Sequence, residues 1–83
     1  MQLARYVKFR EEKFGGVLFE TRSEKVFTLN PTATAVVREI QAGGDQQAIV
    51  DRLKERFDDK SGAIEREVGA LIADLRQRGL IEG

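Results

Sequence analysis

The pattern of the chain changes at one junction, Leu29-Asn30-Pro31. Before it, apolar residues alternate with polar ones, and after it they recur every three or four residues. Asn30 suits a helix N-cap, because its side-chain oxygen can accept hydrogen bonds from free backbone N–H groups. Pro31 suits the first helical position, where its missing N–H costs nothing. The junction therefore predicts strands before it and helices after it, an α+β domain.

Three short strands are predicted before the junction. Val7 and Phe9 share one face of the first. Phe14-Gly15-Gly16 is interpreted as a break, because paired glycines fit a turn or bulge. The connection over residues 21–24 has hairpin length, so the strands should form an antiparallel meander. The predicted strands are residues 6–12, 17–20 and 25–29.

Three amphipathic helices are predicted after the junction. The first should end at Gly43-Gly44, Asp45 and Ser61 should cap the second and third, and the third should run to about Arg78, before Gly79. Residues 58–60 form a polar loop, and Leu80-Ile81 fold back onto the core. The stripes expected to face the core are Ala33, Val36, Val37 and Ile40; then Ile49, Val50, Leu53 and Phe57; then Ile64, Val68, Leu71 and Leu75, with Ile72 on the flank.

The predicted architecture is thus a three-stranded antiparallel sheet followed by a three-helix bundle, in one domain over residues 1–83. The last two helices and the strand pair resemble a winged helix-turn-helix. No apolar run reaches the length that spans a bilayer. The first five residues contain no apolar segment of a signal peptide, so we expect a cytoplasmic protein.

Composition excludes several kinds of chemistry. The 83 residues contain no cysteine and no histidine, which rules out disulfides, Cys/His zinc sites and Ser-His or Cys-His catalysis. The acidic pairs Glu11-Glu12 and Asp58-Asp59 are sequence neighbours, a poor arrangement for acid–base work. Residues 58–62 also lack the ligand spacing of a calcium loop. We expect no enzymatic activity, no metal and no cofactor.

Nucleic-acid binding is the alternative that a winged helix invites. The chain has 14 basic and 14 acidic residues, and both signs are mixed along the last two predicted helices. A modest basic run over residues 5–13 is interrupted by Glu11-Glu12. Gly43-Gly44 precedes Asp45, whose charge opposes a phosphate. A small DNA-binding regulator stays the second interpretation, but nucleic acid is not the expected partner.

The third strand, Lys25-Val26-Phe27-Thr28-Leu29, is the predicted binding site. In a meander it is an edge whose free N–H and C=O groups a peptide can satisfy by adding a strand. Phe27 and Leu29 should share one face, with Val26 and Thr28 opposite. The third helix should form the other wall of a groove. On this helix we expect Ile72 to line the groove and Gly69, which has no side chain, to lower its wall. Glu65 or Arg76 would supply a flanking charge. An equally good interpretation is that Ile72 belongs to the core.

These segments also carry a family resemblance. Leu29-Asn30-Pro31-Thr32-Ala33, followed by Val36-Val37 and Ile40, resembles the "LN-x-TA" junction and helix of PqqD-like proteins. The resemblance extends over about residues 7–81, with Gly16 to Phe19 and Lys25 to Phe27 as strands, residues 49–57 as the second helix and residues 67–81 as the third helix and its end. The chain departs from the pattern in having Pro31 after Asn30 and a shorter N-terminal segment than many members.

The resemblance implies a winged-helix-like fold that recognises precursor peptides of ribosomal peptide-modification pathways. It implies that the leader of the precursor pairs with the third strand and lies against the third helix. It also implies transfer of the peptide to a modifying enzyme, often a radical S-adenosylmethionine protein. The precursor and the pathway are not specified by it. A third interpretation is a structural or dimerisation domain, and we expect at most a weak homodimer.

Overall fold

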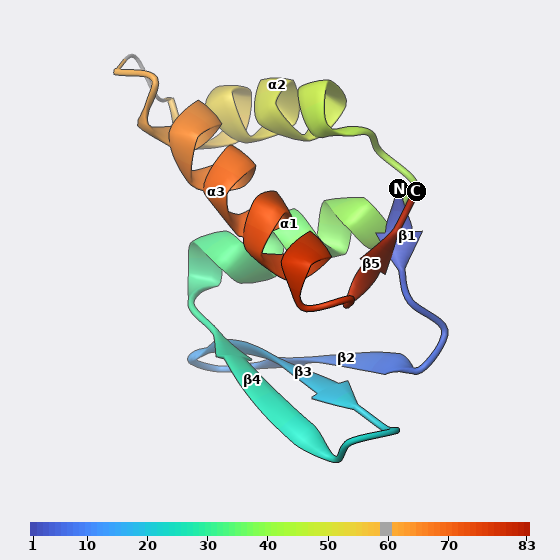
Figure 1. Ribbon diagram of the computed structural model, residues 1–83. Coiled ribbons are helices and arrows are strands. Elements are labelled where there is room, and N and C mark those ends of the chain that lie inside the picture. The colour runs from blue at the N-terminus through green and yellow to red at the C-terminus, as the bar shows by residue number, and fades with distance from the viewer. Residues whose placement is uncertain (59–60) are drawn as a thin grey trace.

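The computed structural model describes residues 1–58 and 61–83, which form a three-stranded sheet, three helices and a small two-stranded sheet (Figure 1). The predicted order of three strands followed by three helices is confirmed. The elements are β1 (Gln2–Leu3), β2 (Val7–Glu12), β3 (Gly15–Glu20), β4 (Lys25–Leu29), α1 (Pro31–Gln41), α2 (Gln46–Phe57), α3 (Ala63–Gln77) and β5 (Ile81–Glu82).

The main sheet is an antiparallel meander with the order β2-β3-β4, so β2 and β4 are its edges. Leu18 pairs with Phe9 on one side and with Phe27 on the other. Leu18 and Leu29 are buried on the face that the helices cover, and the opposite face is turned away from them (Figure 1). The period-two pattern therefore assigned the faces of this sheet correctly.

The break predicted at Phe14-Gly15-Gly16 is correct for Phe14 and wrong for the two glycines, which belong to β3. The turn consists of Lys13 and Phe14, and Glu12 pairs directly with Gly15. A Cβ atom on Gly15 would overlap the carbonyl oxygen of Leu29, and one on Gly16 would lie 2.9 Å from the Thr34 hydroxyl. The glycines allow β3 to pass close to the β4–α1 junction.

Helix caps form as predicted at two of three sites. The side chain of Asn30 accepts from the Ala33 N–H at 2.7 Å, and that of Asp45 from the Ala48 N–H at 2.8 Å. At α3 the cap position is Gly62, with φ of 80° and no side-chain cap, so the prediction of Ser61 as N-cap is wrong. The Ser61 hydroxyl accepts from the Ala63 N–H, two residues further along the chain, at 3.2 Å.

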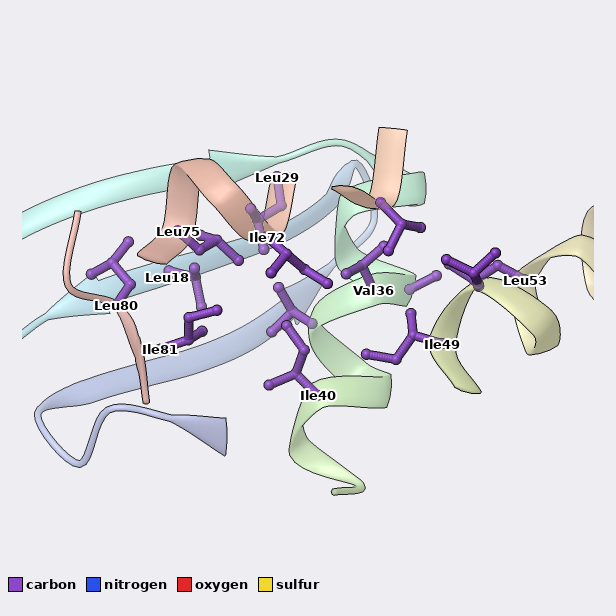
Figure 2. Packing of buried hydrophobic residues seen from close by; sticks show 14 of the residues in the cluster. Leu18, Leu29, Val36, Ile40, Ile49, Leu53, Ile72, Leu75, Leu80 and Ile81 are labelled. Atoms are coloured by element: carbon purple, nitrogen blue, oxygen red, sulfur yellow. The ribbon is translucent and has the colours of Figure 1, made fainter. Parts of the chain in front are cut away.

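One hydrophobic core joins the sheet to the three helices, and the close view in Figure 2 places Ile72 and Leu75 of α3 among residues of β3, β4 and α1. The third stripe differs from the prediction, because Ile72 is buried while Leu71 is only partly buried. Phe57 was predicted to face the core but is 46% exposed. It is the last residue of α2, and the centre of its ring lies 5.7 Å from the Arg56 guanidinium.

The two ends of the chain meet in the small sheet of β1 and β5, which the sequence did not predict. Leu80 and Ile81 are buried, so the prediction that they fold back onto the core is confirmed. The Ala4 N–H donates to the Leu80 carbonyl at 2.9 Å, and the Tyr6 hydroxyl donates to the Gly79 carbonyl at 2.5 Å. Two-residue strands have no periodicity, which explains why the pattern analysis missed them.

The predicted polar loop at residues 58–60 is described only at Asp58, which has a left-handed φ of 49°. The other two residues of that prediction, and hence the pair Asp58-Asp59, lie outside the described residues. In the part of the chain that is described, no helix is long and apolar enough to cross a bilayer. The same residues contain no cluster of three or more acidic side chains that could hold a metal ion.

Candidate functional site

The open edge of β4 is the candidate site. Within residues 1–58 and 61–83, β4 pairs only with β3, so its other edge is free. Phe27 is partly buried and Leu29 is buried on the inner face, whereas Val26 is 59% exposed and Thr28 is also exposed on the outer face. An edge strand of this kind offers unpaired backbone donors and acceptors.

A groove lies between β4 and α3, next to this edge. It consists of two adjoining hollows of about 420 and 400 Å³, which share Asn30, Ala33 and Leu71. The first hollow is lined by Val26, Phe27, Thr28, Leu29, Asn30, Ala33, Leu71, Asp74, Leu75, Arg78 and Leu80. The second is lined by Asn30, Thr32, Ala33, Val36, Glu67, Ala70 and Leu71. We call the two together the β4–α3 groove.

Four of the five predicted strand residues line this groove: Val26, Phe27, Thr28 and Leu29. Lys25, the fifth, begins β4 and pairs with Glu20 across the hairpin. The hydroxyl of Ser23 donates to the Glu20 carboxylate at 2.6 Å, and this bond lowers the pKa of Glu20 below its usual value. Lys25 therefore lies beside a paired carboxylate at the end of the strand, outside the two hollows.

The predicted face of α3 is not the face that lines the groove. Ile72 is only 2% exposed and belongs to the core, so the interpretation of Ile72 as groove lining is wrong. Gly69 does not lower the groove wall, because a Cβ there would point toward Gln46 of α2, 3.6 Å from its side-chain nitrogen. Residues 71, 74 and 78 face the groove instead, and residue 71 lies about 100° around the helix from its neighbour Ile72.

The two predicted flanking charges also lie elsewhere. Glu65 forms an ion pair with Lys54 of α2 at 3.3 Å. Arg76 approaches the sulfur of Met1 at the N-terminus, at 3.9 Å. The error arose from choosing Leu71 for the core and Ile72 for the groove, because Glu65, Gly69 and Arg76 lie on the same helical face as Ile72.

Arg78 and Asp74 in the first hollow, and Glu67 in the second, are charged groups of the groove that the sequence analysis did not assign to the site. The Arg78 guanidinium lies 5.2 Å from the centre of the Phe27 ring and donates to the Asp74 carboxylate at 3.1 Å. Both residues line the groove. The sequence does contain a signal for this face, because Leu71, Asp74, Leu75 and Arg78 follow the i, i+3, i+4, i+7 spacing of one helical face.

The charges on α3 do not form a basic face. Two of its carboxylates have cationic partners, Glu65 with Lys54 and Asp74 with Arg78. On α2, Arg52 pairs with Glu39 of α1 at 2.7 Å. Phosphate binding requires a surface of one sign, because affinity comes from displaced counterions. The described residues offer no such surface along these two helices.

Comparison with known proteins decides the family. The family model described as "Coenzyme PQQ synthesis protein D (PqqD)" matches residues 15–81, from the first residue of β3 to β5. The chain belongs to the PqqD family. The family resemblance and the α+β fold class predicted from the sequence are therefore confirmed. Comparison with curated protein sequences gives no significant match.

Two solved structures share this PqqD-family fold. "TbiB1 in Complex with the TbiA(beta) Leader Peptide" superposes with a TM-score of 0.89 at 19% identity, covering 100% of this chain and 96% of that one. "Lasso peptide synthetase B1 complexed with the leader peptide" gives a TM-score of 0.84 at 23% identity, covering 99% and 96%. At these identities the match establishes the fold of the chain, including the three-stranded sheet and the helices that form the groove.

Proposed function

We propose that residues 1–83 act as one non-catalytic recognition domain for the leader of a ribosomally made precursor peptide. The leader would add a strand to β4 and lie in the β4–α3 groove, and the domain would present it to a modifying enzyme such as a radical S-adenosylmethionine protein. The observation that carries the proposal is the free edge of β4 beside the β4–α3 groove. The two structural neighbours, both complexes with leader peptides, support it.

Backbone pairing supplies the affinity in this proposal. Opposed residues in an antiparallel ladder alternate between pairs that exchange hydrogen bonds and pairs that do not. The pair Glu12 and Gly15 closes a two-residue hairpin, so we take it as a pair that exchanges backbone hydrogen bonds. The alternation then directs the N–H and C=O groups of Gly16, Leu18 and Glu20 toward β4. On β4 it directs those of Val26 and Thr28 toward the open edge, where a leader would meet them.

The groove supplies side-chain selectivity. Alternate residues of an added strand would point inward, between β4 and α3. Ala33 and Leu71 offer an apolar surface to one such residue. Asp74 and Arg78 offer an acid and a base to another, so a polar or charged leader residue would be accepted at that end. No group in this arrangement is asked to perform chemistry.

Thr28→Pro tests the backbone pairing. Proline removes the N–H that we place at the open edge, and edge positions tolerate it when that N–H faces solvent. We expect the affinity for the precursor peptide encoded beside this gene to fall about tenfold or more, the equivalent of one lost hydrogen bond and a misfit strand. Titration calorimetry measures it, with a micromolar dissociation constant expected for the unchanged chain.

Thr28→Val is the matched control, because it keeps the backbone N–H and the branched shape while removing only the hydroxyl. Its affinity should stay within about twofold of the unchanged chain, as for most exposed substitutions. Equal affinities of the proline and valine variants would contradict strand addition at this edge. Absence of binding by the unchanged chain would contradict the proposed function itself.

A further inference from the structure

The outer face of the main sheet carries two rows of side chains, in which Val26 and Thr28 of β4 also line the β4–α3 groove and the residues of β2 and β3 do not. Lys8, Phe19 and Val26 lie side by side in one row across β2, β3 and β4, and Arg10, Val17 and Thr28 form the next row. Because alternate strand residues point to opposite faces, these side chains project away from the helices. In Figure 1 the helices lie on the other side of this sheet.

The centre of this face is apolar and accessible. Phe19 is 37% exposed and Val26 is 59% exposed. A shallow hollow of about 560 Å³ lies here, lined by Lys8, Phe9, Arg10, Val17, Phe19 and Val26. Single exposed apolar side chains are normal, but a contiguous group rimmed by charge marks an interaction surface. We call Lys8, Arg10, Val17, Phe19 and Val26 the outer sheet patch.

The two charged side chains that line this hollow, Lys8 and Arg10, are basic. Lys8 forms no ion pair with any described residue, and Arg10 has only Glu12, at 2.5 Å, with most of its side chain exposed. A partner that places carboxylates around an apolar side chain would match this surface, since complementary charge favours encounter and fixes orientation. A second copy of this chain, packed face to face, would instead bring the same basic side chains together.

We propose that the outer sheet patch is where the modifying enzyme docks, through an apolar side chain flanked by carboxylates. The enzyme as occupant rests on the proposed function. A leader strand added beside β4 would extend the row from Phe19 through Val26 onto the peptide, so the enzyme would contact domain and peptide together. A standard interface buries roughly 800 Å² per partner, and in this arrangement the patch and the bound peptide would both contribute to that surface.

Charge reversal at Lys8 tests the docking surface. The probe is the modifying enzyme encoded beside this gene, titrated against the domain alone and against the domain loaded with its precursor peptide. Lys8→Glu should weaken enzyme binding about fivefold or more in both titrations, through repulsion of the facing carboxylates. Phe19→Ser should weaken it about tenfold by removing the apolar centre. Precursor affinity should change by no more than about twofold, because neither residue lines the groove.

Arg66→Glu on α3 is the matched control, an equal charge reversal at an exposed position away from the patch, and it should leave enzyme binding unchanged. Enzyme affinities of Lys8→Glu and Phe19→Ser equal to that of the unchanged domain would overturn the inference while leaving peptide recognition intact. A dimer in sedimentation that Phe19→Ser dissolves would also overturn it, because the patch would then be a self-interface. Loss of peptide binding in the unchanged chain would refute only the proposed function, since the titration without peptide still reports on the patch.

Discussion

A Gly15→Ala variant is expected to lose about 3 kcal/mol or more of unfolding free energy, enough to unfold much of so small a domain. Gly15 has a φ of 145°, which side chains rarely adopt. Its new Cβ would overlap the Leu29 carbonyl oxygen and lie 2.8 Å from the Asn30 carbonyl carbon. Both obstacles are backbone atoms of the β4–α1 junction, so no side-chain rotation can relieve them. Urea denaturation followed by circular dichroism measures the loss.

Gly43→Ala separates the cost of a positive φ from the cost of steric overlap with the β4–α1 junction. Gly43 also has a positive φ, 91°, but a Cβ there would meet nothing within 4 Å. The Gly43→Ala variant should therefore lose only about 1 kcal/mol of unfolding free energy, the cost of placing alanine at a positive φ. If the two variants unfold at the same urea concentration, the close approach of β3 to the junction does not exist, and the arrangement of β4 beside the groove has to be revised.

Ile72→Ala is expected to lose mainly stability, whereas Leu71→Ala is expected to lose mainly affinity for the precursor. Ile72 is 2% exposed in the core, so truncation should lower the unfolding free energy by about 3 kcal/mol. Leu71 lines both hollows of the β4–α3 groove, so its truncation should lower precursor affinity about tenfold. Leu71→Ala should also unfold at a higher urea concentration than Ile72→Ala, because Leu71 is only partly buried.

Measuring precursor affinity and urea unfolding on both variants checks this separation. The precursor affinity of Ile72→Ala should be measured without urea, at a temperature at which the variant is still folded. It should then resemble the precursor affinity of the unchanged chain. The opposite result would be that Ile72→Ala binds weakly while folded and Leu71→Ala binds normally. It would mean that the peptide contacts the face of α3 with Gly69 and Ile72, as the sequence analysis predicted.

Local chemistry was enough to predict most of the fold. The caps at Asn30 and Asp45 act within three residues of themselves, and the alternation in β4 needs no knowledge of the helices. Gly15 shows the limit of this approach. Gly15 is needed because the β4–α1 junction, 14 residues further along the chain, leaves no room for a Cβ atom. In the sequence, a glycine required by such a distant contact cannot be told from a turn glycine.

The helical wall of the site was less predictable for a related reason. Leu71 and Ile72 are adjacent and similar in hydrophobicity, so a periodic pattern cannot decide which of them meets the sheet. Packing against β3, β4 and α1 makes that decision, and it assigns Ile72 to the core. Asp74 and Arg78 were therefore not among the predicted site residues, although the Arg78 guanidinium lies 5.2 Å from the centre of the Phe27 ring at the groove.

The central claim, that a leader pairs with β4 and lies against α3, is tested most directly by backbone amide NMR of the labelled domain. Unlabelled precursor peptide is added until the spectrum stops changing. The largest shifts should fall on Val26 to Asn30 and on residues 67–78, and the amides of Val26 and Thr28 should gain protection from hydrogen exchange as they enter a ladder. Saturating shifts confined to β2 or α2, with no added protection on β4, would contradict the claim.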